Sequence, residues 1–259
     1  MSAAATTVGE VTGETELATF PACHRCGSFT AGPPQLCLAC VRRQLPTPGA
    51  DGCPVCSQRL RPDATCGNEL CRSGARRISR IRAIGYQSGP LRRVINSYKY
   101  RGTHSWALVL GRLLTAWLEE NCAADPPDLI VANPGYAGPG GASFAHAETV
   151  LAAAAAAAGG DRWPFDSSAI VKTLPTLASA SAQAWSKRVA GAELRGALRV
   201  PDRSKTTGRH ILVYDDICTT GMQLDAVAAC LLDQGQAARV EAVVLARAAW
   251  REPGLGQVS

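Results

Sequence analysis

Short apolar runs and longer amphipathic stretches alternate over the last two thirds of the chain. The apolar runs predict six strands, over 78–87, 128–133, 169–172, 197–200, 211–214 and 240–246. Helices are predicted between them, beginning at Pro90, over 104–120, over an Ala-rich segment that includes 152–158, and after Gly221. Strands that alternate with helices indicate an α/β protein with a mostly parallel, doubly wound sheet. Ligands of such sheets bind at the carboxyl ends of the strands, where Asn133 and Asp215 are both expected.

The segment 210–223 joins a buried strand to a helix through a short polar turn. Four apolar residues are followed by Asp215 and Asp216, and the turn Thr219-Thr220-Gly221 precedes an amphipathic run over 224–232. Such a turn directs backbone N–H groups, hydroxyls and the positive end of a helix dipole to one point, as binding of a phosphate requires. The carboxylates would repel a phosphate, but they accept hydrogen bonds from vicinal hydroxyls. The segment therefore predicts a sugar-phosphate site.

Eight of the eleven cysteines lie between residues 23 and 71. They form the close pairs Cys23/Cys26, Cys37/Cys40, Cys53/Cys56 and Cys66/Cys71. Two such pairs of thiolates typically hold one tetrahedral Zn²⁺. A shift of thirty residues places Cys23 on Cys53 and Cys26 on Cys56, which favours two sequential sites over interleaved ones. A disulfide framework is the alternative, but residues 1–20 contain no Lys, no Arg and no apolar run typical of a signal peptide, which favours zinc.

The segment 210–223 resembles the phosphoribosyl diphosphate (PRPP) binding signature of type I phosphoribosyltransferases. In that signature, apolar residues, two acids, any two residues, Thr-Thr-Gly and a small residue follow in order; here Met222 and Gln223 replace the usual small residue and Thr. The resemblance implies that the acids hold the ribose hydroxyls and that the turn holds the 5-phosphate. The implied ligand-binding residues are Asp215, Asp216, Ile217, Cys218, Thr219, Thr220, Gly221, Met222 and Gln223. Cys218 could also be a low-pKa nucleophile, although an ordinary loop position is favoured.

Two zinc ribbons ahead of such a domain look like the ComF family, which is associated with DNA uptake and competence. Tyr98-Lys99-Tyr100-Arg101-Gly102 resembles the Lys-Tyr-Arg-Gly segment of that family. Gln183, Lys187-Arg188 and Val189-Ala190-Gly191-Ala192 resemble its glutamine, arginine and Val-x-Gly-Ala stretch, so that the similarity covers roughly residues 20–247. The resemblance implies two structural Zn²⁺ sites, Mg²⁺ with PRPP, and a catalytic set of Asp215, Asp216, Lys187 and Arg188.

The loop after the 128–133 strand departs from the family pattern. The family usually has Arg-Gly-Phe-Asn-Gln there, whereas this chain has Gly141-Ala142-Ser143-Phe144-Ala145-His146-Ala147, without the basic side chain expected near pyrophosphate. His146 could take its place. Two functions therefore stay open. The first is a PRPP-dependent transferase, and the second is a non-catalytic, single-stranded DNA-binding competence factor with a vestigial PRPP site.

Charge adds one feature to this interpretation. The chain of 259 residues has a net charge of +6, yet no acid occurs between Glu69 and Glu119. The basic residues in that stretch are Arg72, Arg76, Arg77, Arg80, Arg82, Arg92, Arg93, Lys99, Arg101 and Arg112. This pattern predicts contact with a polyanion, with Arg92, Arg93 and Lys99 on a free helix face. Tyr86, Tyr98, Tyr100 and Trp106 could stack on bases, although core positions are favoured for them.

The predicted organisation has four parts. Residues 1–20 are expected to be disordered, 21–76 to form a double zinc ribbon, 77–248 the phosphoribosyltransferase domain, and 249–259 a flexible C-terminus. No apolar run reaches membrane-spanning length, so that a cytoplasmic protein is expected. The expected partners are PRPP or ribose 5-phosphate, single-stranded DNA, and DNA-uptake or recombination proteins.

Overall fold

The computed structural model describes residues 45, 47–136, 145–159, 162–176 and 184–248, and for 184–190 it describes the backbone alone. Cys23, Cys26, Cys37 and Cys40 lie outside the described residues, as do the predicted terminal segments 1–20 and 249–259. In the described part of the chain, no helix is long and apolar enough to cross a membrane.

Four parallel strands form the central sheet. In the order β1-β6-β5-β2, they are β1 (Arg80–Tyr86), β6 (Arg239–Arg247), β5 (His210–Cys218) and β2 (Leu129–Ala132). All three strand pairs are parallel, so that every strand ends at the same edge of the sheet. The predicted α/β class with a parallel sheet is confirmed.

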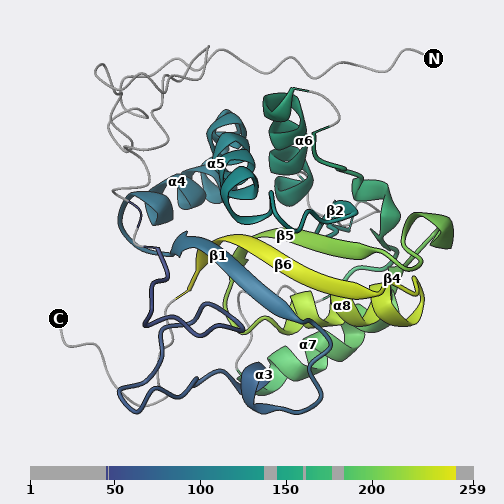
Figure 1. The fold of residues 1–259 in the computed structure, drawn as a ribbon, viewed down its shortest axis with the longest axis horizontal. Helices are drawn as coiled ribbons and strands as arrows, with labels where there is room; N and C mark the ends of the chain where they lie inside the picture. Colours follow the sequence, from purple (N-terminus) through teal and green to yellow (C-terminus); the bar gives the residue numbers. More distant parts are fainter. Residues whose placement is uncertain (1–44, 46, 137–144, 160–161, 177–183, 249–259) are drawn as a thin grey trace.

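Helices cover both faces of this sheet. Figure 1 shows α4 (Gly89–Tyr100), α5 (Trp106–Asn121) and α6 (His146–Ala158) on one face, and α7 (Ala184–Ala197) and α8 (Met222–Asp233) on the other. The sheet is therefore doubly wound, as the alternation of strands and helices predicts.

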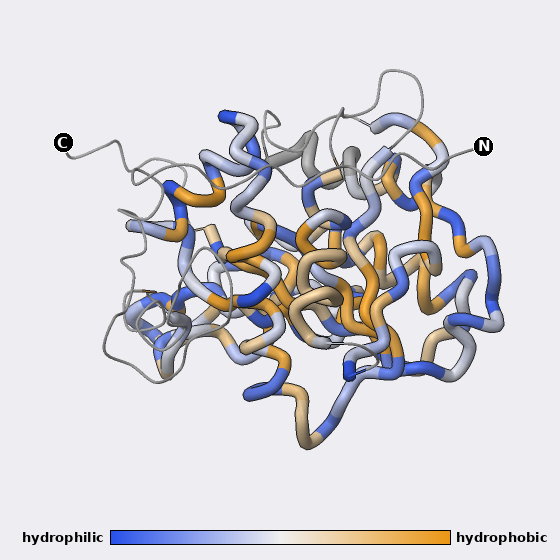
Figure 2. Tube along the Cα trace, turned by 90° about the horizontal axis from the view of Figure 1, so that it is seen from above, coloured by the Kyte–Doolittle hydropathy of each residue, from blue (hydrophilic) through white to orange (hydrophobic). Residues whose placement is uncertain are grey.

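The strands are apolar throughout because both of their faces are buried. On β5, Leu212 and Tyr214 belong to the core beneath α4, α5 and α6, whereas Ile211 and Val213 belong to the core against α7 and α8. Figure 2 shows the same arrangement as apolar segments in the interior of the tube.

The helices α5 and α6 approach each other closely. A side chain at Gly111 would place its first carbon 2.7 Å from the backbone nitrogen of Ala154, which leaves room for glycine only. Thr115 on α5 donates a hydrogen bond to the carbonyl of Ala154, at 3.1 Å. The Ala-rich stretch therefore serves close helix packing, in line with its small side chains.

Two predicted strands are not part of the central sheet. The segments β3 (Val171–Lys172) and β4 (Leu198–Arg199) pair with each other, antiparallel, in a separate two-stranded sheet. Each has only two residues, and Lys172 and Arg199 are partly or fully exposed, so that neither could fill a strand buried on both faces. Short helical turns α3 (Glu69–Arg72), η1 (Ser167–Ala169) and η3 (Arg203–Lys205) complete the described elements.

The strand β5 is longer than its apolar run. Its pairing with β6 continues through Asp215, opposite Val244, to Cys218, opposite Arg247. The two acids therefore lie on the strand itself and not in the turn that follows, because the sheet supplies backbone partners for them despite their charge.

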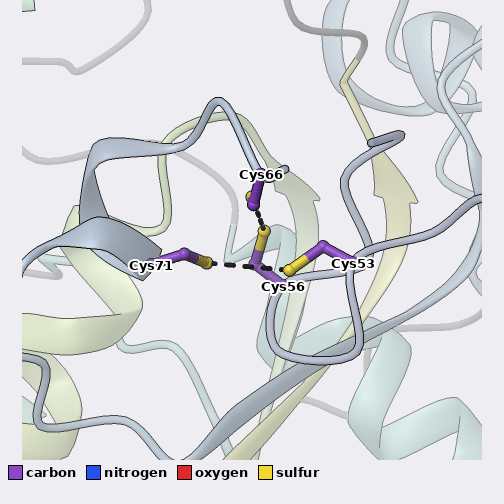
Figure 3. A group of neighbouring side chains, drawn as sticks. All are labelled: Cys53, Cys56, Cys66 and Cys71. Atoms are coloured by element: carbon purple, nitrogen blue, oxygen red, sulfur yellow. Dashed lines mark hydrogen bonds between the residues drawn. The ribbon is translucent and has the colours of Figure 1, made fainter. Parts of the chain in front are cut away.

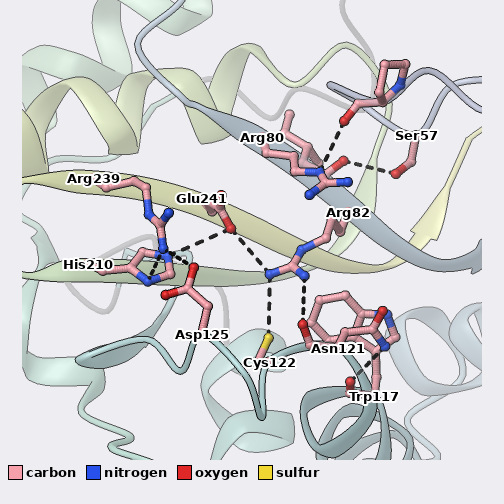
Figure 4. Close-up of polar contacts among 12 residues, drawn as sticks. Ser57, Arg80, Arg82, Trp117, Asn121, Cys122, Asp125, His210, Arg239 and Glu241 are labelled. Carbon is pink, nitrogen blue, oxygen red and sulfur yellow. Dashed lines mark hydrogen bonds and ion pairs between the residues drawn. The ribbon is translucent and has the colours of Figure 1, made fainter.

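Polar side chains join the strands at the amino edge of the sheet, far from the acids along β5. Arg82 on β1 lies 3.3 Å from Glu241 on β6 and donates to the sulfur of Cys122 at 3.5 Å (Figure 4). Arg239 lies 2.8 Å from Nδ1 of His210 at the start of β5. These contacts connect β1, β6 and β5 at the edge opposite the predicted ligand site.

Candidate functional site

Asp215 and Asp216 lie in the second half of β5, and both are buried, with 9% and 6% of their surface exposed. Asn133, directly after β2, donates from Nδ2 to Oδ2 of Asp215 at 2.9 Å. The backbone N–H of Asp216 donates to Oδ1 of Asp215 at 2.8 Å. Asn133 and Asp215 thus meet at the carboxyl edge of the sheet, where the sequence places them.

Lys99 reaches the same point from the last turn of α4. Its Nζ lies 2.7 Å from Oδ2 of Asp216, and only 23% of its side chain is exposed. Burial by itself lowers the pKa of Lys99, but Asp216 and Asp215 outweigh burial and raise it, so that the ammonium stays charged. The prediction that Lys99 lies on a free basic face is wrong, because α4 follows β1 and ends at the carboxyl edge of the sheet.

The pKa of Asp215 is raised to about 7, first by burial and then by the neighbouring charge of Asp216. Lys99 and the hydrogen bond from Asn133 oppose this rise. Asp215 therefore holds a proton more readily than an exposed aspartate; its carboxylate form accepts hydrogen bonds and its carboxyl form also donates one. Either form can bind a hydroxyl group.

The turn after β5 begins α8. Gly221 has φ +82°, and a side chain there would place its first carbon 2.8 Å from Cδ1 of Ile81, so that both conformation and space require glycine. Thr219 is exposed, and the hydroxyl of Thr220 accepts from the N–H of Met222 at 3.4 Å. A small pocket here is lined by Asp215, Ile217, Cys218, Thr219, Thr220, Gly221, Gln223 and Leu224.

The pocket includes most of the predicted ligand-binding residues. Asp216 and Met222 are not among its lining; Asp216 faces Lys99, and Met222 is half-buried against the core beneath α7 and α8. Cys218 is buried, and burial is the main reason that its pKa is raised to about 11. A thiol with this pKa is protonated at neutral pH, which argues against a nucleophilic role.

Lys187 and Arg188 lie in the first turns of α7, and their side chains are outside the described set. One turn further on, a side chain at Gly191 would contact Met222 at 3.9 Å. The helix that carries the two basic residues therefore packs beside the first turn of α8.

His146 begins α6 close to Lys99 and Asp216, and its ring lies 5.2 Å from that of Tyr98. Burial, followed by the charge of Lys99, lowers its pKa. Both effects favour the neutral imidazole over the cation that the missing basic side chain of the loop would supply. The segment 141–144 itself lies outside the described residues.

Cys53, Cys56, Cys66 and Cys71 point toward one another (Figure 3), and their sulfur atoms all lie within 4.8 Å of one another. The Cys56–Cys66 and Cys53–Cys71 sulfur distances are 3.7 and 4.0 Å. Four sulfurs bound tetrahedrally at roughly 2.3 Å from Zn²⁺ would be about 3.8 Å apart, whereas a disulfide needs about 2.05 Å. The cluster therefore fits one zinc ion, with the sequential pairing that the thirty-residue repeat favours.

A larger cavity of about 340 Å³ lies elsewhere, between β1, α5 and the segment around Leu45. Arg82, Trp117 and Glu120 are among its lining residues. None of the predicted ligand-binding residues lines this cavity, so that its size does not make it the sugar-phosphate site.

The basic stretch is not a single free surface. Arg77 pairs with Asp233, Arg82 with Glu241 and Lys99 with Asp216. Arg76 and Arg80 donate to backbone carbonyls, at 2.8 and 3.1 Å. These five basic residues are therefore engaged within the protein, and the predicted contact with a polyanion stays a prediction. Of the four aromatic residues proposed for base stacking, Tyr98 and Trp106 are buried in the core and Tyr86 is half-buried, whereas Tyr100 is 68% exposed.

No protein-family model matches this sequence, and no curated protein matches it. Several solved structures are similar to it, and two of them are described here. "The allosteric regulatory enzyme of purine biosynthesis" is 18% identical, over 55% of this chain and 26% of that chain, with a TM-score of 0.34. A hypoxanthine phosphoribosyltransferase from Staphylococcus aureus is 12% identical, over 54% of this chain and 62% of that chain, with a TM-score of 0.34. The alignment spans less than two thirds of either structure.

Proposed function

We propose that this chain is a ComF-like protein that binds PRPP or ribose 5-phosphate at the carboxyl edge of β5. The observation that carries this proposal is the pocket formed by Asp215 and the turn Thr219–Gly221 at the start of α8. A buried carboxylate and a helix N-terminus at one pocket, with the second carboxylate of Asp216 next to it in the chain, suit a ligand that has both hydroxyls and a phosphate.

In this proposal, the 5-phosphate binds to the N–H groups and hydroxyls of Thr219 and Thr220, and the ribose hydroxyls bind to Asp215 and Asp216. Lys99 has a distinct role, because two carboxylates without a counter-charge would repel an anionic ligand. Its ion pair with Asp216, at 2.7 Å, removes one negative charge from the site without occupying the pocket. Lys99 therefore permits the acids and a sugar phosphate to coexist.

Phosphoribosyl transfer is the finer part of the proposal. As C1 of the ribose loses pyrophosphate, negative charge grows on the leaving group, and catalysis needs cations there. Mg²⁺ brought by PRPP would supply part of that charge, and Lys187 and Arg188 at the start of α7 are the proposed protein contribution. Because the loop 141–147 lacks an Arg or Lys and the neutral form of His146 is favoured, we expect ligand binding to exceed catalytic efficiency.

Calorimetry with ribose 5-phosphate tests the site. Replacing Asp215 and Asp216 together by Asn removes charge-assisted hydrogen bonds of about 1.5–3 kcal/mol each, so that affinity should fall by about a hundredfold or more. Asp202→Asn is the matched control, because Asp202 is an exposed acid that caps η3 through Ser204. An unchanged affinity in the double variant would show that the acids do not hold the ribose.

A second function is favoured by one surface of α4. Arg92, Arg93 and Arg101 are exposed there, and Tyr100 beside them is the more exposed of the two large apolar side chains that protrude from the described residues. Exposed arginines next to an exposed aromatic ring suit the backbone and bases of single-stranded DNA. We propose this helix as the point of contact with DNA, and the link to competence and to DNA-uptake or recombination proteins depends on it.

A further inference from the structure

The turn proposed to bind the phosphate, residues 219–221, has its carbonyl groups fixed by hydrogen bonds. The carbonyls of Cys218, Thr219 and Thr220 all accept hydrogen bonds from buried side chains on one side of the turn. Arg247 Nη1 donates to the carbonyl of Cys218 at 2.8 Å and also to that of Thr219. Asn68 Nδ2 donates to the carbonyl of Thr220 at 3.1 Å. In a planar trans peptide, the carbonyl of one residue and the N–H of the next point in opposite directions. The N–H groups of Thr219, Thr220 and Gly221 therefore point away from Arg247 and Asn68.

The three N–H groups are free to bind a ligand. Within the described part of the chain, none of them donates a hydrogen bond. They lie where the helix α8 begins and next to the pocket that Asp215 lines. A turn of this form needs its carbonyls fixed, because rotation of one peptide unit would turn an N–H away from the phosphate.

The residues that fix the carbonyls are in turn held by the cysteine cluster. Arg247 Nη2 donates to Oε1 of Gln58 at 2.6 Å and lies 3.7 Å from the sulfur of Cys56. Asn68 lies between Cys66 and Cys71, and its N–H donates to the sulfur of Cys66 at 3.5 Å. Arg247 is 0% exposed and Asn68 is 2% exposed, so that water does not compete for either side chain.

The positive charge of Arg247 also connects this residue to the cysteine cluster. In the described part of the chain, this buried guanidinium contacts backbone carbonyls, the sulfurs of Cys218 and Cys56, and the amide of Gln58, but no carboxylate. An uncompensated buried charge costs several kcal/mol. Four thiolates around one Zn²⁺ carry a net charge of −2, and Cys56 is one of the four, so that the occupied cluster supplies the counter-charge that Arg247 lacks.

We propose that Arg247 and Asn68 are positioning residues that hold the phosphate-binding turn open, and that the cysteine cluster, with its metal, fixes both of them. The sugar-phosphate site then depends on a cluster that does not touch the ligand. This inference rests on the proposed function, since it assigns a purpose to the orientation of the turn.

Asn68→Ser provides the sharpest test. Oδ1 of Asn68 accepts from the N–H of Leu70 at 3.1 Å and so caps α3; serine retains this cap but is too short to reach the carbonyl of Thr220. Ser73→Ala is the control, because Ser73 also lies next to the cluster but bonds to the carbonyl of Leu70 and not to the turn. For each full-length protein we would measure the zinc content, the ¹⁵N order parameters of residues 219–221, and the affinity for ribose 5-phosphate.

We expect Asn68→Ser to retain its zinc, to lower the order parameters of the turn, and to weaken ribose 5-phosphate binding about fivefold, as loss of one neutral hydrogen bond implies. Ser73→Ala should match the wild type in all three. Unchanged order parameters in Asn68→Ser would overturn the proposal. Zinc loss in Asn68→Ser alone would also overturn it, because Asn68 would then serve the metal site. Failure of the wild type to bind ribose 5-phosphate would refute the proposed function, while the order parameters would still decide the positioning role.

Arg247→Lys tests the second residue. Lysine keeps the positive charge beside Cys56 but lacks the planar fork that reaches Gln58 and the turn at the same time. We expect retained zinc with lower order parameters at Cys218 and Thr219. The same order parameters as in the wild type would show that Arg247 does not position the turn.

Discussion

At the scale of single residues, Asp215 combines burial with a neighbouring carboxylate. Its pKa of about 7 lies above the ordinary value of 3.8, so that the folded protein holds this proton more tightly than the unfolded chain. The stability from this residue is therefore fully present below about pH 4 and is lost as the pH rises through 7. We predict that Asp215→Asn reduces the decline in the free energy of unfolding between pH 4 and pH 8, as measured by urea denaturation.

Asp202 is the control for this measurement, because its pKa shift has the opposite sign to that of Asp215. Hydrogen bonds from Ser204 lower the pKa of Asp202, so that Asp202→Asn should leave the decline between pH 4 and pH 8 in place. An equal decline in the wild type and in Asp215→Asn would mean that Asp215 is ionised throughout this range.

Gly221 gives a second prediction at this scale. A left-handed backbone costs a residue with a side chain about 1–2 kcal/mol, and the contact with Ile81 adds to this cost. We predict that Gly221→Ala lowers the free energy of unfolding by more than about 1 kcal/mol. Gly196→Ala, in the open last turn of α7, should instead raise it by roughly 0.5–1 kcal/mol. A change of less than about 1 kcal/mol in Gly221→Ala would indicate that the turn adopts another conformation at little cost in stability.

At the scale of elements, the cysteine cluster stabilises the segment 47–76, which has little apolar core of its own. We predict two zinc ions per full chain, one at Cys53, Cys56, Cys66 and Cys71 and one at the four cysteines before residue 41. Structural zinc contributes on the order of 10 kcal/mol to such small modules. Elemental analysis of Cys56→Ala should show the loss of one zinc ion, whereas Cys122→Ala, which changes a buried thiol outside the cluster, should retain both.

Helix α4 has one buried apolar face and one exposed basic face. Leu91, Val94, Ile95 and Tyr98 are buried, whereas Arg92 and Arg93 are exposed. If this face binds DNA, Arg92→Glu with Arg93→Glu should lower both the affinity for an oligonucleotide and the dependence of that affinity on salt. Binding of ribose 5-phosphate should stay unchanged. Oligonucleotide binding that does not vary with salt would show that Arg92 and Arg93 do not contact DNA phosphates.

At the scale of the whole molecule, local patterns predicted the fold better than they predicted its contacts. The apolar runs correctly gave the four parallel strands, because strands buried on both faces must be apolar. The same rule failed for 169–172 and 197–200, where only two residues of each run form a strand, and these strands, β3 and β4, pair outside the central sheet. The extension of β5 through Asp215 could not be predicted, because it depends on backbone pairing with β6.

Some contacts at the site could not be predicted from the sequence because they join residues far apart in the chain. The sequence placed Lys99 in a basic stretch and in a segment that resembles the family pattern, but neither feature indicated its partner. The ion pair of Lys99 with Asp216 joins residues more than a hundred positions apart. Arg247 ends an apolar strand, and a charged residue in such a place is a signal that could have been noticed. Its partners Gln58 and Cys56 lie some 190 positions earlier, so that no local pattern could identify them.

A crystal structure of the protein with ribose 5-phosphate would test the central claim most directly. The proposed function predicts the phosphate within about 3 Å of the N–H groups of residues 219–221, and ribose hydroxyls within hydrogen-bonding distance of Asp215 or Asp216. Ligand bound elsewhere, such as in the cavity between β1 and α5, would contradict it.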